Sequence, residues 1–502
     1  MKRSKFSLSH YKLLSCYMGN LVPITWFEVL PGDTMQQVSN LLLRVSPLLA
    51  PVMHPVNVTI HHWYVPLRII WPDVEKFITG GPDGFDATVP PYITTITPNT
   101  SWQVQGELLD FLGLDPETPA GINISALPLR AYAKIFNENY RDQDLVTALA
   151  LSEGNGSDTT TSKLMQNGAW QKDLFTSARP WTQKGPEVTI PLVGDAPVET
   201  SATPGVTGPQ AALHFKDTAG NPFTVTAGLG VTSGSELSFG GASPGAAAVG
   251  YPDNLYANLQ GVSAANVNEL RLAFALQRYE EARARWGSRY TEYLRYLGVR
   301  SSDARLQRPE YLGGGKQTVQ FSEVLQTAPG ADSQVGDLKG HGINFTRSRR
   351  YRRFFEEHGI VMSLLCVRPI TMYPQGIGRQ WNRTTKEMYW QRELQHIGQD
   401  QVFNKEIYSQ HATPNGVFGY QDRYDEYRRM ESSVAGNFRT DLDFWHMARL
   451  FSADPTLNAS FVTSNPTLRI NAVQNEPNLW IMAHHSIQAR RMVAKTGTSF
   501  IY

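Results

Sequence analysis

Alternation of apolar and polar residues predicts several strands along this chain of 502 residues. In residues 56–65, valine and isoleucine alternate with polar side chains, as in a strand with one covered face. Residues 359–370 form a continuous apolar run whose length is typical of a strand buried on both faces. Residues 188–190 and 318–325 predict two more strands. The pattern therefore favours an all-β protein.

One long segment, residues 266–297, has the period of a helix instead. Asn266 is a suitable N-cap, and Val267, Leu270 and Phe274 recur on one apolar face. The charged residues that follow alternate in sign, which is typical of a solvated face. A glycine interrupts the pattern once before it resumes. The segment predicts a helix with an apolar face. The extended segment that follows this helix is expected to lie against a packed surface.

Two further segments have clear local signals. Pro309 keeps residues 308–314 extended, and the glycines after it allow positive φ or a close approach of the backbone. Residues 127–143 predict a short helix with Pro128 in its first turn and an aromatic stripe. Its acidic and basic residues at 138–142 could resemble an acid–base pair, but a solvated, ion-paired helix face is the better interpretation.

The chain divides into three parts by composition. Residues 1–193 contain an N-terminal arm and the first part of the β core, with the helix near 128–142. Residues 194–262 are rich in Gly, Ala, Ser, Thr and Pro, which predicts an inserted, exposed excursion. Residues 263–502 contain the long helix and the remainder of the core.

Composition narrows the classes of protein. The net charge of +1 gives no global signal for nucleic acid, so any such binding depends on local patches. Charged residues make up 18%, while 41 Gly and 31 Pro suit a β protein with many turns. Two cysteines cannot build a disulfide framework, which favours a reducing compartment. We expect no membrane insertion, no signal peptide and no cofactor.

One dense basic cluster lies within residues 345–355, where arginines and aromatic residues interleave. Arginines that follow a phosphate backbone and rings that stack on bases suit single-stranded nucleic acid. The alternative is an edge strand that its charges protect from aggregation. The N-terminal basic residues are either a solvated tail or a second nucleic-acid contact. The candidate DNA-binding residues are Arg347, Arg349, Arg350, Tyr351, Arg352, Arg353, Lys2, Arg3 and Lys5.

The C-terminal third is rich in Tyr, Trp and Arg, residue types that are enriched in tight protein interfaces. The candidate interface residues are Tyr311, Tyr424, Tyr427, Arg428, Trp445 and His446. His446 follows two aspartates, but no nucleophile elbow accompanies it, so we predict no catalytic role. The adjacent histidines His61 and His62 point to opposite faces of a strand, which does not suit a shared metal ion.

Many short motifs in this order resemble the major capsid protein of the Microviridae, the small single-stranded DNA phages, and its gokushovirus-like branch. The N-terminal half supplies Leu30-Pro31-Gly32-Asp33, His61 to Arg68, Tyr140-Arg141-Asp142-Gln143 and Pro180-Trp181. The C-terminal half supplies Arg308 to Gly314, Glu357-His358-Gly359, Tyr373-Pro374-Gln375-Gly376, Tyr424 to Arg428 and Trp445-His446. The resemblance covers nearly the whole chain.

The resemblance implies an eight-stranded antiparallel viral jelly roll with long inserted loops and a few helices. It implies a structural protein, not an enzyme, that assembles through pentamers into a T=1 icosahedral shell around circular single-stranded DNA. Implied partners are further copies, internal scaffolding and DNA pilot proteins, and a host receptor met by the inserted protrusion. The implied locations are the virion and, during assembly, the bacterial cytoplasm. From the residues alone, a glycan-active or glycan-binding β-sandwich protein stays open as an alternative.

Overall fold

The computed structural model describes most of the chain: residues 3–189, 267–287, 289–325 and 335–495. Two compact units divide the chain, one of residues 1–184 with 281–502 and one of residues 185–280. Between residues 190 and 266 only short strands are described, namely β8 (Val198–Thr200), β9 (Phe215–Asp217), β10 (Pro222–Phe223), β11 (Leu229–Val231), β12 (Leu237–Phe239), β13 (Gly250–Pro252) and β14 (Leu255–Ala257). Most of the predicted insertion therefore lies outside the described residues.

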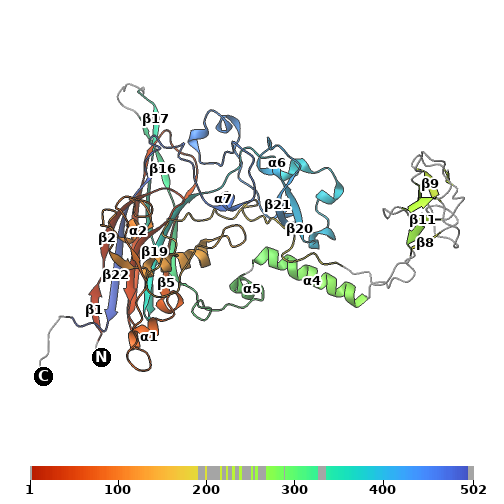
Figure 1. Ribbon diagram of the computed structural model, residues 1–502. Coiled ribbons are helices and arrows are strands. Elements are labelled where there is room, and N and C mark those ends of the chain that lie inside the picture. The colour runs from red at the N-terminus through yellow and green to blue at the C-terminus, as the bar shows by residue number, and fades with distance from the viewer. Residues whose placement is uncertain are drawn as a thin grey trace. The chain divides into compact units, whose positions relative to one another are not determined.

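The first unit is built on a sandwich of two antiparallel sheets (Figure 1). The first sheet has the order β2 (His10–Cys16), β22 (Leu479–Arg491), β4 (Thr34–Leu48) and β17 (Leu338–Arg347). Three short strands extend it, namely β1 (Ser4–Ser7), β16 (Gln320–Leu325) and β18 (Tyr351–Phe354). The second sheet has the order β15 (Glu310–Thr318), β5 (Val56–Pro66), β19 (Gly359–Pro369) and β3 (Leu21–Val29). The chain crosses repeatedly between the sheets, which confirms the predicted jelly roll.

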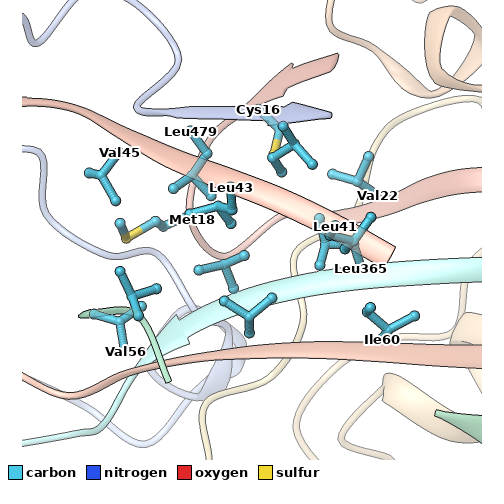
Figure 2. Close-up of a cluster of buried hydrophobic side chains, with 14 of the residues drawn as sticks. Cys16, Met18, Val22, Leu41, Leu43, Val45, Val56, Ile60, Leu365 and Leu479 are labelled. Carbon is cyan, nitrogen blue, oxygen red and sulfur yellow. The ribbon is translucent and has the colours of Figure 1, made fainter. Parts of the chain in front are cut away.

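Apolar side chains from both sheets fill the space between them. Figure 2 shows Leu41 and Leu43 of β4 and Leu479 of β22 on one side, with Ile60 of β5 and Leu365 of β19 on the other. All five are buried. Since successive strand residues face opposite sides, this cluster uses only every second position of each strand.

The outer face of the second sheet is covered by helices. Here α2 (Leu108–Leu112) and α3 (Leu127–Ile135), which continues as a π-helix over Phe136–Tyr140, pack on the strands. Trp63 and Val65 of β5 belong to this outer cluster, while Val56, Val58 and Ile60 face the inner one. The prediction of one covered face for residues 56–65 was therefore wrong, because the helix layer covers the other face. The predicted two-sided burial of residues 359–370 is confirmed.

A third cluster organises the C-terminal region. Strands β20 (Gln399–Phe403) and β21 (Val417–Asp422) pack with α6 (Asn404–Ile407) and α7 (Ala459–Val462). The remaining short elements are α1 (Val74–Thr79), β6 (Tyr92–Thr94) and β7 (Asn123–Ser125), with 3₁₀ turns at Leu67–Ile69, Arg379–Asn382, Lys386–Met388, Leu394–His396, Asp425–Tyr427, Gly436–Arg439 and Asp443–Trp445. This third cluster supplies a further apolar core within the same unit.

The predicted long helix is present as α4 (Val267–Trp286) and α5 (Tyr290–Tyr296), and the chain breaks between them at Gly287, where φ is +95°. The apolar face of α4 is largely unburied. Val267 and Phe274 are exposed, and Ala284 alone is buried among the described residues of α4. The glycines that follow behave as expected, because a Cβ at Gly314 would collide with the carbonyl oxygen of Ile60. β15 thus lies close against β5.

Candidate nucleic-acid interface

The outer face of the seven-stranded sheet differs from that of its partner, since most of its outward side chains are exposed or half-buried. We call it the bare face. Five rows of outward positions cross β22 and β4 in register: Lys5, Arg490, Thr34 and Phe354; Ser7, Gln488, Gln36 and Arg352; Tyr11, His484, Asn40 and Arg347; Leu13, Met482, Leu42 and Phe345; and Ser15, Trp480, Arg44 and Ile343. A shorter row of Ser486 and Val38 lies between the second and the third. None of these positions holds Asp or Glu. The bare face is therefore free of negative charge along its rows.

The predicted arginine cluster lies at one end of this face. Arg347 ends β17, Arg349 and Arg350 form the turn, and Arg352 and Arg353 lie on β18. All five side chains are exposed. Arg353 donates to a carboxylate oxygen of Glu310 at 2.7 Å, and within the described part of the chain the other four have no carboxylate partner. Four guanidinium groups are thus available to an anionic ligand.

Tyr351 does not belong to this exposed set, contrary to the prediction. The side chain is 7% exposed, and its hydroxyl donates to Oε1 of Gln37 at 2.7 Å. Burial raises the pKa of this phenol. Because β18 pairs with β4 so that Tyr351 faces inward, it anchors the strand between the sheets. The exposed rings of the cluster are instead Phe345 and Phe354.

The N-terminal arm reaches the same place. β1 pairs with β22, which sets Lys5 opposite Arg490, and the guanidinium of Arg3 lies 5.0 Å from the centre of the Phe354 ring. Lys2 lies outside the described residues. The structure thus brings Arg3 and Lys5 to the arginine cluster, although more than 300 residues separate them in sequence.

Sequence reasoning missed the strand that joins these parts. Residues 479–491 alternate cleanly, with Leu479 and Ile481 inside and Trp480, Met482 and Arg490 outside. That alternation over thirteen residues is the signal that predicts a half-covered strand, and it marks both Trp480 and Arg490 as outward.

Beneath the arginine cluster, hydrogen-bonded polar side chains join the two sheets. Gln37 of β4 donates to the hydroxyl of Ser363 on β19 at 3.0 Å, and the same hydroxyl lies 2.7 Å from Nδ1 of His62 on β5. On the first sheet, Ser39 lies 2.8 Å from Nδ1 of His485. We call these residues the polar bridge. Burial lowers the pKa of both histidines to about 3, so they are neutral near pH 7.

The predicted interface residues divide into two sets. Tyr311, Tyr427 and Arg428 are exposed, and Trp445 is half-buried. Tyr424 and His446 are buried within their own subunit, where Nε2 of His446 lies 2.7 Å from the carbonyl oxygen of Phe438. These two are therefore packing residues, not contact residues. Their residue types are common in interfaces, but both side chains are buried inside the subunit and so are not available to contact another copy.

Two buried carboxylates of the C-terminal region, those of Glu406 and Glu426, are bound to arginines. A cavity of about 560 Å³ is lined by Glu406 and Glu426, among others. Arg379 contacts both carboxylates, at 3.2 and 3.6 Å, and Arg383 contacts Glu426 at 3.2 Å. Burial raises the pKa of Glu406. The arrangement is that of an ion-pair network within a subunit, and it does not supply the two free carboxylates facing across a cleft that glycoside hydrolysis needs.

The other acidic candidates are also paired. Asp142, placed in sequence on a solvated helix face, is buried and contacts Lys172 and Arg179. Adjacent His61 and His62 lie on opposite faces, with His61 2.7 Å from the hydroxyl of Tyr140. No group of three or more possible metal ligands, and no helix long and apolar enough to cross a membrane, occurs among the residues that the structure describes.

Comparison with known protein sequences finds relatives that match nearly the whole chain. Residues 1–501 match the sequence model of a family described as capsid protein (F protein). The capsid protein VP1 of Bdellovibrio phage phiMH2K is 36% identical over 92% of this chain and 88% of its own length. The corresponding proteins of Chlamydia phage 1 and Spiroplasma virus 4 are 33% and 32% identical, over 93% and 92% of this chain and 90% and 87% of their own lengths.

The relatives and the family match extend over both sheets, the helix layer and the C-terminal cluster, so they concern the whole chain and not one motif. The family is structural and its members are located in the virion. A jelly roll of this topology that leaves one sheet face uncovered agrees with such a role. The chain belongs to the capsid protein (F protein) family, the major capsid proteins of the Microviridae.

Proposed function

We propose that this chain is the subunit of a T=1 icosahedral shell that encloses circular single-stranded DNA, with the bare face directed at the genome. The observation that carries this proposal is the bare face itself. It has four guanidinium groups at one end that lack a carboxylate partner among the described residues, the N-terminal arm beside them, and no acidic side chain along its rows. Such a surface attracts a polyanion whatever its sequence.

Assembly is tested by size. Sedimentation and negative-stain microscopy of the expressed chain, with and without single-stranded DNA, internal scaffolding protein and DNA pilot protein, should yield uniform spheres or pentamer-sized precursors. The shell is closed by contacts between copies, for which we propose Tyr311, Tyr427, Arg428 and Trp445. A chain that stays monomeric under every one of these conditions would contradict the proposal.

DNA contact is tested separately from assembly. Replacing Arg347, Arg349, Arg350 and Arg352 by Ser removes the unpaired guanidinium groups and leaves the inward-facing residues of β17 and β18 in place. We expect particles that assemble but contain much less DNA, because each lost phosphate contact lowers the affinity for DNA. Each loss also makes the affinity less dependent on salt concentration. Lys386→Ser, at an exposed lysine elsewhere in the same unit, is the matched control. Normal DNA content in the fourfold variant would refute the role of the cluster.

The insertion at residues 194–262 is proposed as a host-facing protrusion. It interrupts the jelly roll between the helix layer and β15, so the core strands do not depend on its sequence. Deleting it should preserve particle assembly and abolish adsorption to host cells. Unchanged adsorption by the shortened particles would remove the receptor role.

A further inference from the structure

The bare face changes character along its strands. The two rows at the end of β22 that holds Arg490 are basic and polar, whereas the two rows at the opposite end hold Met482, Trp480, Leu42 and Phe345. Phe345 is 60% exposed and Trp480 is 46% exposed. A soluble subunit gains nothing by leaving such rings in water, so this half of the face is suited to a ligand with flat apolar surfaces.

Three exposed rings of the bare face have a guanidinium group beside them, whereas a fourth, Tyr11, stacks on His484. Arg44 lies directly opposite Trp480 across the β22–β4 pair. Arg347 follows Phe345 by two residues on the same face, a separation of roughly 7 Å. Arg3 lies over Phe354, as described above. A ring and a cation repeated at this spacing match the two parts of a nucleotide, its base and its phosphate.

A cavity adjoins the row that contains Trp480. It has a volume of about 620 Å³ and is lined mainly by apolar residues, with Arg44 and His341 among the polar ones. Its size lies within the range of small-ligand sites. The face therefore offers a recess beside its most exposed indole, as well as a flat platform.

We propose that the bare face binds single-stranded DNA with bases stacked on Trp480 and Phe345 and phosphates held by the adjacent arginines. This inference rests on the proposed function and deepens it, since it names the side chains that hold the bases and those that hold the phosphates. Duplex DNA hides its bases within the stack and can use only the basic rows. The occupant is nucleic acid rather than a protein segment because the apolar rows continue without interruption into the arginine cluster and carry no acidic residue.

The test compares three labelled probes on the purified full-length chain: oligo(dT) of about twenty nucleotides, an abasic strand of equal length, and a hairpin duplex. We expect oligo(dT) to bind roughly tenfold more tightly than the abasic strand. Trp480→Ala should weaken oligo(dT) binding by roughly tenfold and leave binding of the abasic strand unchanged, while Trp480→Phe retains most of the affinity. Trp381→Ala, which removes an indole that is 86% exposed outside the bare face, is the matched control.

The outcomes separate the two proposals. Equal affinity for oligo(dT) and the abasic strand, with no effect of Trp480→Ala, would overturn base stacking. If the fourfold arginine variant then still binds both single-stranded probes more weakly than the wild-type chain does, the proposed function stands without base stacking. If Trp480→Ala leaves DNA binding intact but reduces particle assembly, the apolar rows bind protein and the inference is wrong. Thermal midpoints of all variants confirm that the fold is retained.

Discussion

The two sheets of the jelly roll use the same alternation but differ in what their outward positions contain. On β5 and β19 those positions hold Trp63, Val65 and Ile360, and the chain covers them with its own helices. On β22 and β4 they hold Trp480 and Gln488, which are exposed, and Asn40, which is half-buried. The residue types at the outward positions therefore differ between the covered and the uncovered sheet face. The uncovered face is the one available to bind a partner.

Exchanging a tryptophan for alanine on each sheet gives the largest contrast. Trp63 is 7% exposed and donates from its indole nitrogen to the hydroxyl of Tyr140 at 3.0 Å. Trp63→Ala should lower the free energy of unfolding by about 3–5 kcal/mol, because it opens a cavity under the helix layer. Trp480→Ala should cost less than about 1 kcal/mol, since water already reaches the ring. Urea unfolding of both variants measures the difference, and equal losses would show that the bare face is covered.

The strands of the two sheets can largely be predicted from the sequence, but which sheet face is covered cannot. The runs at 56–65 and 359–370 predict strands because each carries its own pattern. Whether the second face of a strand is covered depends on α3, some sixty residues away from β5 in sequence, so the pattern of residues 56–65 alone cannot decide it. The exposure of the apolar residues of α4 could not be predicted either. The helical period identifies which residues share a face, but not whether another element packs against that face.

The candidate site shows the same division. The arginines form a run, so composition alone identifies them. Tyr351 lies in the middle of that run, yet its register with β4 turns it inward, and register depends on a pairing with residues more than 300 positions away. The meeting of Lys5 with Arg490 depends on long-range pairing in the same way.

The polar bridge joins the two sheets, and acid should weaken it. The pKa of His62 and of His485 is about 3 in the folded chain against 6.5 ordinarily. The unfolded chain therefore takes up protons first as the pH falls below 6.5, and stability declines until the pH approaches the folded values. Each histidine should cost up to roughly 2 kcal/mol at pH 5.

The check is the unfolding free energy between pH 7 and pH 4 for the wild-type chain and for His485→Gln, which keeps a polar side chain opposite Ser39. The variant should be less stable at pH 7 but should lose stability more slowly on acidification, by about one proton. His396→Gln, at an exposed histidine outside the polar bridge, is the control variant. An unaltered slope in His485→Gln would mean that this histidine is protonated equally in both states.

The smallest expected effect separates two neighbouring arginines of the arginine cluster, Arg352 on the bare face and Arg353 on the opposite side of β18. Arg353 is paired with Glu310, whereas Arg352 has no carboxylate partner in the described part of the chain. Arg352→Ser should therefore lower the salt dependence of single-stranded DNA binding by roughly 0.7 in the logarithmic slope, while Arg353→Ser should change it very little. Neither variant should alter unfolding by more than about 1 kcal/mol, because both side chains are exposed. Glu310→Gln removes the ion pair, so the Arg353 side chain should then contribute to the salt dependence of DNA binding as Arg352 does. If all three variants shift the slope equally, the pairing with Glu310 does not hold in the DNA complex, and the whole arginine cluster, paired or not, acts as one charged surface.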